Sequence, residues 1–146
     1  MSKVISDACL SAKWVLPERF SDIAQRLLNE WLSTGVEICA PPLWESELDG
    51  ILRHRVWAGQ ISQADADSAE LALDNVPVTV KQVPGVRQLA RQIAKQANQR
   101  RVYDSVYAAL ADIEGGELWT ADYLFYQAVH NFLPFVKYLG NYQSQP

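Results

Sequence analysis

The sequence predicts a single α/β domain whose parallel sheet is covered by helices on both faces. Short β-favouring segments alternate with helical segments along the whole chain, the order that parallel strands with helical crossovers require. The length of 146 residues suits one domain. With 49% hydrophobic and 21% charged residues, the composition is typical of globular proteins and excludes disordered and fibrous classes. We expect the domain to span 1–142, with a frayed tail over 143–146.

Local signals predict the elements of the first half of the chain. Apolar residues recur with a helical period between Phe20 and Trp31, and Gly35 ends that helix. Pro42 suits the first turn of another helix, which Gly59 closes. In order, the predicted elements are a strand over 3–6, helices over 8–16 and 20–34, a strand over 36–40, and helices over 42–57 and 62–74.

The second half continues the alternation. Residues 78–83 alternate β-branched and polar side chains, which is typical of a strand, and Pro84 and Gly85 separate them from the next helix. Gly115 and Gly116 break the chain before another strand. The predicted elements are a strand over 78–83, a basic helix beginning near residue 86, a helix over 103–113, a strand over 118–120, a helix over 121–130 and a strand over 135–139.

The net charge of −4 conceals a strongly basic segment. Six basic residues and no acidic residue lie between Lys81 and Arg101, so the remainder of the chain is strongly acidic. Arg87, Arg91 and Lys95 repeat every four residues beside an apolar helix face, and Arg100 and Arg101 follow them. Two interpretations remain open, a solvated helix face and a binding surface for an anionic partner. The absence of acidic residues favours the second.

Three aspartates lie where a predicted strand or loop leads into a helix. Asp7 follows the first strand, Asp122 follows the strand over 118–120, and Asp104 opens a helix after the basic segment. Ligands of open parallel sheets bind beyond the carboxyl ends of the strands, so these positions suit a site. Aspartate is also a favoured residue at helix N-termini, so each of the three alone could serve as a cap.

Glu47 is the most unusual of the acidic residues. It lies on the apolar stripe of its predicted helix, between Trp44 and Ile51, where a carboxylate requires a partner. An arginine or a bound cation would serve, and we favour the cation. If Asp7, Glu47, Asp104 and Asp122 meet, each pair at 4 Å repels by about 4 kcal/mol at an effective dielectric near 20. Oxygen ligands suit Mg²⁺ or Mn²⁺, and such a centre serves hydrolytic phosphoryl transfer.

The remaining composition bears on the environment of the protein. Cys9 and Cys39 are too few for a disulfide framework or a zinc site, and we expect both to be reduced and buried. No segment approaches the roughly 20 apolar residues of a membrane span, and Asp7 and Lys13 interrupt any signal-like run near the start. These observations predict an unexported cytoplasmic protein with no membrane partner.

Four segments together resemble the motifs of PIN-domain ribonucleases, the group that includes VapC-type toxins of toxin–antitoxin pairs. The first motif is similar to 4–8 with 13–14 and 16–18, the second to 42–52, the third to 103–111 and the fourth to 118–122. They occur in the family's order and cover the chain from Val4 nearly to Leu139. Each motif alone is weak, and the four in order are specific.

The resemblance implies an α/β/α sandwich and an Mg²⁺- or Mn²⁺-dependent endoribonuclease that cuts single-stranded or structured RNA. Asp7, Glu47, Asp104 and Asp122 match the family's four metal-binding acids. Thr120 matches the residue that helps to hold the metal-bound water or the substrate phosphate, and it could instead be a helix N-cap. The resemblance further implies a homodimer and a small antitoxin partner. The basic residues at 87, 91, 95, 100 and 101 would then bind RNA.

One departure from the family pattern supports an alternative function. The family often carries Asn three residues after the second-motif Glu, where this chain has Gly50. Together with the net acidity, this departure is compatible with a non-catalytic PIN-like module that binds nucleic acid or protein. His54 and His130 match no motif and receive no catalytic role.

Overall fold

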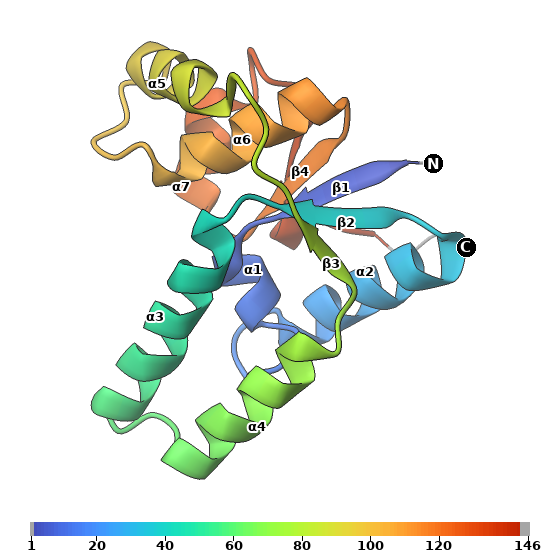
Figure 1. Ribbon diagram of the computed structural model, residues 1–146, viewed down its shortest axis with the longest axis vertical. Helices are drawn as coiled ribbons and strands as arrows, with labels where there is room; N and C mark the ends of the chain where they lie inside the picture. Colours follow the sequence, from blue (N-terminus) through green and yellow to red (C-terminus); the bar gives the residue numbers. More distant parts are fainter. Residues whose placement is uncertain (1, 144–146) are drawn as a thin grey trace.

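Five parallel strands form one sheet in the computed structural model, which describes residues 2–143 (Figure 1). The strand order is β3-β2-β1-β4-β5, so β1 lies in the centre. The predicted α/β fold with a parallel sheet is confirmed. The strands are β1 (Lys3–Ser6), β2 (Glu37–Ala40), β3 (Val78–Val80), β4 (Glu117–Thr120) and β5 (Val136–Tyr138).

The helices cover both faces of this sheet. In Figure 1, α5, α6 and α7 lie above the sheet and the first four helices lie below it. The helices are α1 (Ala8–Ala12), α2 (Ser21–Thr34), α3 (Leu43–Trp57), α4 (Gln63–Asp74), α5 (Val86–Gln96), α6 (Tyr103–Glu114) and α7 (Tyr123–Val129), followed by the 3₁₀ helix η1 (Leu139–Asn141). This layered arrangement is the α/β/α sandwich that the resemblance implied.

Helix α6 forms the centre of the upper layer. It packs on β1 and β4 beneath it and against α5 outside it. Small and apolar side chains allow this close packing, since Ala108, Ala109, Leu110 and Ala111 are fully buried. The turn into β4 also passes close to β1, where a Cβ at Gly116 would lie 2.5 Å from the carbonyl oxygen of Lys3. The first turn of α6, which carries Asp104, is therefore anchored on a rigid base.

Several predicted boundaries are wrong by a few residues, and the backbone explains each difference. Helix α1 ends at Ala12 and not at residue 16, because the N–H groups of Lys13, Trp14 and Val15 bond to the third residue before them. Strand β3 ends at Val80, and the strand after α7 ends at Tyr138, where η1 begins. Of the predicted tail, residues 144–146 lie outside the described residues.

The two cysteines differ from the prediction in one respect. Both are free thiols, and Cys39 is buried in β2. Cys9 was expected to be buried and is exposed, because it lies on the side of the short helix α1 that faces away from the core. Within residues 2–143, no helix is both long and apolar enough to cross a membrane.

Candidate active site

The carboxyl ends of β1 and β4 bring two of the predicted acids to one edge of the sheet. The strands are parallel neighbours, with Ser6 in register with Trp119. The N–H of Asp7 donates to the carbonyl oxygen of Trp119 at 3.3 Å, which continues the pairing past the end of β1. Asp122 therefore follows β4 at the same edge at which Asp7 follows β1.

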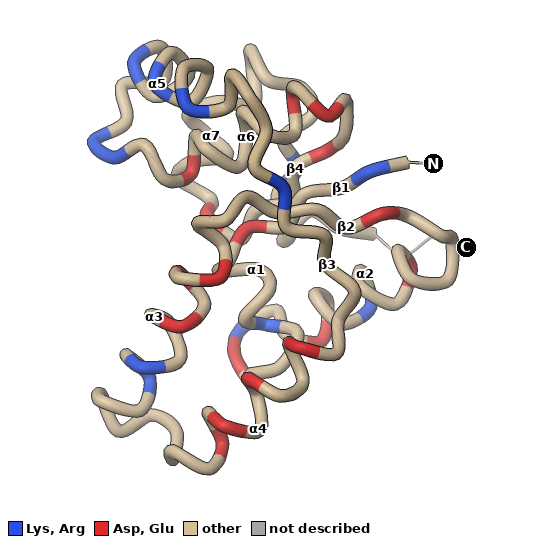
Figure 2. Tube along the Cα trace, in the orientation of Figure 1, with Lys and Arg blue, Asp and Glu red and all other residues tan. Residues whose placement is uncertain are grey.

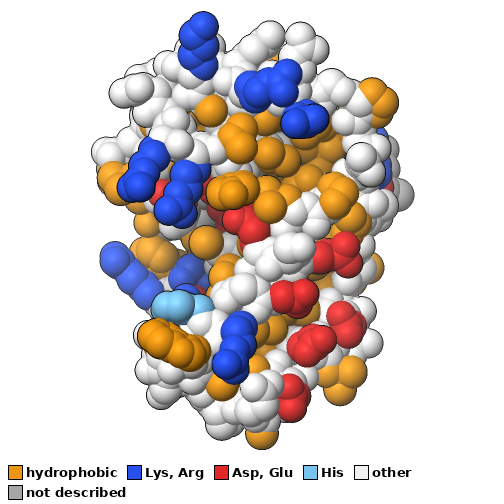
Figure 3. All heavy atoms as spheres, turned by 60° about the vertical axis from the view of Figure 1, so that its left-hand side comes forward, with side chains coloured by type: hydrophobic (Ala, Val, Ile, Leu, Met, Phe, Trp, Pro, Cys, Tyr) orange, Lys and Arg blue, Asp and Glu red, His pale blue; other side chains and the backbone are white. Residues whose placement is uncertain are grey.

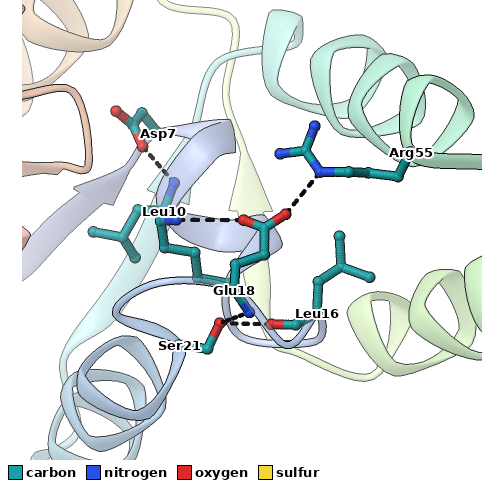
Figure 4. Close-up of polar contacts among 7 residues, drawn as sticks. Asp7, Leu10, Leu16, Glu18, Ser21 and Arg55 are labelled. Atoms are coloured by element: carbon teal, nitrogen blue, oxygen red, sulfur yellow. Dashed lines mark hydrogen bonds and ion pairs between the residues drawn. The ribbon is translucent and has the colours of Figure 1, made fainter. Parts of the chain in front are cut away.

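Two hydrogen bonds hold the side chain of Asp7 in a buried position. Its side chain is 4% exposed, and its Oδ1 caps α1 by accepting from the backbone N–H of Leu10 at 2.8 Å (Figure 4). Its Oδ2 accepts from Thr120 Oγ1 at 2.5 Å. Burial raises the pKa of Asp7 to about 6, although both hydrogen bonds oppose that shift. The capping interpretation is correct for one oxygen only, since the other is held by the neighbouring strand.

Asp104 lies in the first turn of α6 and is half-buried. Its pKa is raised to about 7, first by burial and then by the charges of Asp7, Asp122 and Glu47. An interaction with the side chain of Asp122 adds to the rise in the pKa of Asp104. The four predicted acids thus share one electrostatic environment.

Thr120 connects two of these acids. Its buried hydroxyl donates to Asp7 and accepts from the backbone N–H of Asp122 at 3.0 Å. The N-cap of α7 is Asp122, whose Oδ1 accepts from the N–H of Phe125 at 3.0 Å. The alternative in which Thr120 caps this helix is therefore wrong. The single hydroxyl proton of Thr120 is already donated to Asp7, so the residue holds the two acids in position.

Glu47 has a partner that the sequence did not predict. Its side chain is half-buried, and its Oε1 accepts a hydrogen bond of 2.5 Å from the hydroxyl of Tyr107 on α6. Burial and this hydrogen bond both raise the pKa of Tyr107. No ion pair involves Glu47 within residues 2–143, so the arginine alternative is not observed. Tyr107 lies one turn after Asp104, and this helical spacing was the available signal.

The thiol of Cys9 lies within electrostatic range of all four carboxylates. Its pKa is raised to about 12, first because water is removed from part of the thiol, and then by four nearby negative charges. Those charges belong to Asp7, Asp104, Glu47 and Asp122. We call these four residues the acidic centre.

The chemistry of the acidic centre fits a hard divalent cation. All of its donors are carboxylate oxygens, and burial together with neighbouring negative charges raises the pKa values of Asp7 and Asp104. In the part of the chain that the structure describes, no three His, Cys, Asp or Glu side chains are placed to hold a metal ion together. Mg²⁺ commonly keeps several waters and binds through one or two carboxylates, which is the mode that this spacing allows.

An ion-pair network ties together the two helices that carry Asp7 and Glu47. Glu18 accepts from Arg55 Nε at 2.9 Å (Figure 4). It also accepts from Lys13 Nζ at 3.3 Å. Lys13 ends α1, and Arg55 lies two turns after Glu47 on α3. Glu18 therefore fixes these two helices relative to each other.

The predicted basic residues form an exposed surface above the acidic centre. Figure 2 shows basic residues along α5 and the loop that follows it, and Figure 3 shows a hollow with acidic side chains below basic ones. The exposed residues are Arg87, Arg91, Lys95, Arg100 and Arg101. No ion pair within residues 2–143 involves any of them, whereas Lys81 pairs with Glu37 and Glu114. The exposure of these basic residues agrees with both interpretations of them, a solvated helix face and a binding surface for an anionic partner.

Solved structures share this fold over nearly the whole chain. PAE2754 from Pyrobaculum aerophilum superposes with a TM-score of 0.66 at 17% identity, covering 95% of this chain and 92% of that one. VapBC2 from Rickettsia felis, bound to a DNA fragment from their promoter, gives 0.63 at 11% identity, covering 93% and 98%. FitAB bound to the IR36 DNA fragment gives 0.61 at 14% identity, covering 98% and 99%. No family model and no curated sequence matches the chain.

At sequence identities of 11–17%, the structural likeness establishes the fold of this chain alone. This chain has the fold of PAE2754, VapBC2 and FitAB, which confirms at the level of the fold the resemblance that the four sequence motifs indicated.

Proposed function

We propose that this protein is an Mg²⁺- or Mn²⁺-dependent endoribonuclease and the toxin of a toxin–antitoxin pair. One observation carries the proposal: four carboxylates from α3, α6 and the ends of β1 and β4 act on one another at the carboxyl edge of the sheet. Such crowding raises the free energy of the folded protein unless a cation or protons are bound. The likeness to VapBC2 and FitAB, which share the fold, supports the toxin assignment.

Asp7, Glu47, Asp104 and Asp122 would hold the metal ion. When bound, the ion would lower the pKa of a water molecule and compensate the charge that builds up on the scissile phosphate. The remaining residues position these ligands. Thr120 and the N–H of Leu10 orient Asp7, and Tyr107 orients Glu47.

The RNA strand would be held by the basic surface. Arg87, Arg91, Lys95, Arg100 and Arg101 are exposed and form no ion pair among the described residues, so their charges are available to phosphates. A net charge of −4 repels a polyanion, and these cations overcome that repulsion locally. We further propose that the protein acts in the cytoplasm, where such a substrate occurs.

The proposed partners follow from the same site. An antitoxin that carries a basic side chain into the acidic centre would compensate its charge and exclude the metal ion. The family resemblance also supports a homodimer. Co-expression with any short reading frame that directly precedes this one, followed by purification of a complex, tests the antitoxin expectation.

RNA cleavage with Mn²⁺ or Mg²⁺ tests the enzymatic proposal. We expect the wild-type protein to cleave, and Asp7→Asn and Asp104→Asn to lose at least about a hundredfold in rate because each removes a charged ligand. Asp112→Asn is the matched control, since Asp112 is exposed on the same helix two turns away. Cleavage that survives unchanged in the two variants contradicts the proposal.

A non-catalytic module is the second candidate. It is favoured by the lack, within residues 2–143, of three side chains placed to enclose an ion, and by Gly50 near Glu47. Calorimetric titration with Mn²⁺ separates the two functions. A folded protein that binds no divalent ion would be a binding module, and one that binds Mn²⁺ through Asp104 supports the nuclease.

A further inference from the structure

Four aromatic rings form a continuous cluster that the acidic centre does not use. The ring of Tyr138 lies 5.1 Å from that of Tyr123, 5.8 Å from that of Tyr126 and 6.5 Å from that of Phe20, measured between centroids. His130 extends the cluster by stacking on Tyr126 at 4.7 Å with an interplanar angle of 14°. We call Phe20, Tyr123, Tyr126 and Tyr138 the aromatic rim.

The aromatic rim is adjacent to the acidic centre. Tyr138 is the last residue of β5 and is paired in register with Thr120, whose hydroxyl holds Asp7. Tyr123 directly follows Asp122 and begins α7. Because the strands are parallel, Tyr138 lies at the same carboxyl edge as the acids, one strand further out. A chain bound at the acidic centre would reach the rim within a few residues or nucleotides.

The rings are only partly covered by the protein. Tyr123 is 48% exposed and its neighbour Leu124 is 76% exposed, while Phe20, Tyr126 and Tyr138 are half-buried. Rings that served only the core would be enclosed on both faces. This arrangement leaves aromatic surface available to a ligand.

Two backbone features accommodate the rings at this edge. Phe20 has a φ of 68°, in the left-handed region that non-glycine residues seldom adopt and that costs free energy. Gly140 lies beneath Tyr138, and a Cβ there would collide with the ring. The fold therefore retains an unfavourable backbone conformation at one ring and a side-chain-free position under another.

A cation accompanies the rings. The guanidinium of Arg19 lies 4.6 Å from the centroid of Phe20, and Arg19 is otherwise exposed. Flat aromatic faces beside a positive charge match a nucleotide, whose base stacks and whose phosphate is anionic. Bases in a duplex are already stacked on one another, so this surface selects unpaired ones.

We propose that the aromatic rim stacks unpaired nucleobases of an RNA strand, so that a phosphate near the stacked base enters the acidic centre. This inference rests on the proposed nuclease function and specifies its substrate as single-stranded at the bases beside the cleaved bond. Tyr123, the most exposed ring, makes the principal contact, and Arg19 binds a neighbouring phosphate.

Fluorescence anisotropy in the presence of EDTA tests stacking without cleavage. The probe is a labelled oligouridylate of about 12 nucleotides, compared with an abasic strand of equal length. We expect Tyr123→Ala to weaken oligouridylate binding about fivefold or more, and Tyr123→Phe to bind as the wild type does. The abasic strand should bind the wild type and Tyr123→Ala equally. Leu124→Ala is the matched control, because it removes exposed apolar surface without removing a ring.

The salt dependence separates this inference from the proposed function. Tyr123→Ala should leave the slope of log affinity against log salt unchanged, because it removes no charge. Equal oligouridylate binding by Tyr123→Ala and the wild type overturns the stacking inference alone and leaves the rim to a protein partner. An equal loss on the abasic strand also overturns it. Failure of the wild type to bind any strand overturns both proposals.

Discussion

The acidic centre and the basic surface of α5 lie near each other and are built in opposite ways. Each acid except Glu47 comes from the end of a strand or helix. Hydrogen bonds from Leu10, Thr120, Tyr107 and Phe125 fix the orientations of Asp7, Glu47 and Asp122. The basic side chains are exposed and, within residues 2–143, take part in no ion pair. Carboxylates held in fixed orientations suit a reaction at one atom of a substrate. Exposed basic side chains suit binding to the phosphates of a flexible RNA strand.

The difference also concerns stability. Burial and mutual repulsion raise the pKa values of Asp7 and Asp104, which shows that their ionised forms are unfavourable in the folded protein. Exposed cations on a helix surface have little effect on folding. Variants of the two regions should therefore change different measurements.

Among variants outside the acidic centre itself, the largest effect is expected from the groups that orient the acids. Thr120→Val and Tyr107→Phe keep the side-chain shape and remove a hydroxyl that donates to Asp7 or Glu47. We expect each to lower the metal-dependent cleavage rate and Mn²⁺ affinity about 10–100-fold. Tyr103→Phe, on the exposed side of α6, is the control and should behave as the wild type. Wild-type Mn²⁺ affinity in both hydroxyl variants would mean that the acids need no such support.

The next effect is the pH dependence of stability in metal-free buffer. Asp7 and Asp104 have folded-state pKa values of about 6 and 7, above the ordinary 3.8. The folded state therefore binds more protons than the unfolded state between pH 4 and 7, and stability falls as pH rises through this window. For Asp7 the loss between pH 5 and pH 8 is on the order of 1–2 kcal/mol. Thermal unfolding at pH 5 and pH 8 measures it.

Two comparisons isolate the acidic centre in that experiment. Asp104→Asn should reduce the pH dependence, because one of the two titrating groups is absent. Mn²⁺ should raise the melting temperature at pH 8 more than at pH 5, where protons compete for the carboxylates. If the wild-type protein is equally stable at pH 5 and pH 8 and Mn²⁺ has no effect, the carboxylates of the acidic centre do not destabilise the folded protein as proposed.

A smaller and more uniform effect is expected from the basic surface. Replacing Arg87, Arg91 and Lys95 with Gln should weaken binding to RNA of any sequence. The slope of log affinity against log salt should fall by about 0.7 for each phosphate that the variant no longer neutralises. Thermal stability should be unchanged. An unaltered affinity would return the stripe to the interpretation of a solvated helix face.

The smallest effect is expected at Gly50. This residue lies inside α3, is exposed, and has open space where a Cβ would be. Gly50→Ala should therefore raise the free energy of unfolding by about 0.5–1 kcal/mol, because glycine loses the most conformational freedom in a helix. Chemical denaturation measures this change. A destabilised variant would show that α3 requires a glycine here.

Much of the fold could be predicted because its signals are local. The alternation of strands and helices, the breaks at Gly35 and Gly115, and the capping sites at Asp7 and Asp122 each depend on a few consecutive residues. The placement of Asp7, Asp104 and Asp122 at the starts of helices followed from the same signals. Short elements were the least predictable, as the early end of α1 at Ala12 shows, since i−3 hydrogen bonds replace helical ones without a distinct sequence pattern.

The sequence by itself determined the parallel α/β architecture and singled out the four carboxylates as candidates, because periodicity and capping are properties of neighbouring residues. Only the tertiary structure decided what surrounds them. Tyr107 meets Glu47 across 60 residues, and Thr120 meets Asp7 across 113. The exposure of Cys9 and the assembly of the aromatic rim from α2, α7 and β5 have the same origin. Contacts between distant segments depend on how helices pack on the sheet, and no short pattern in the chain encodes that packing.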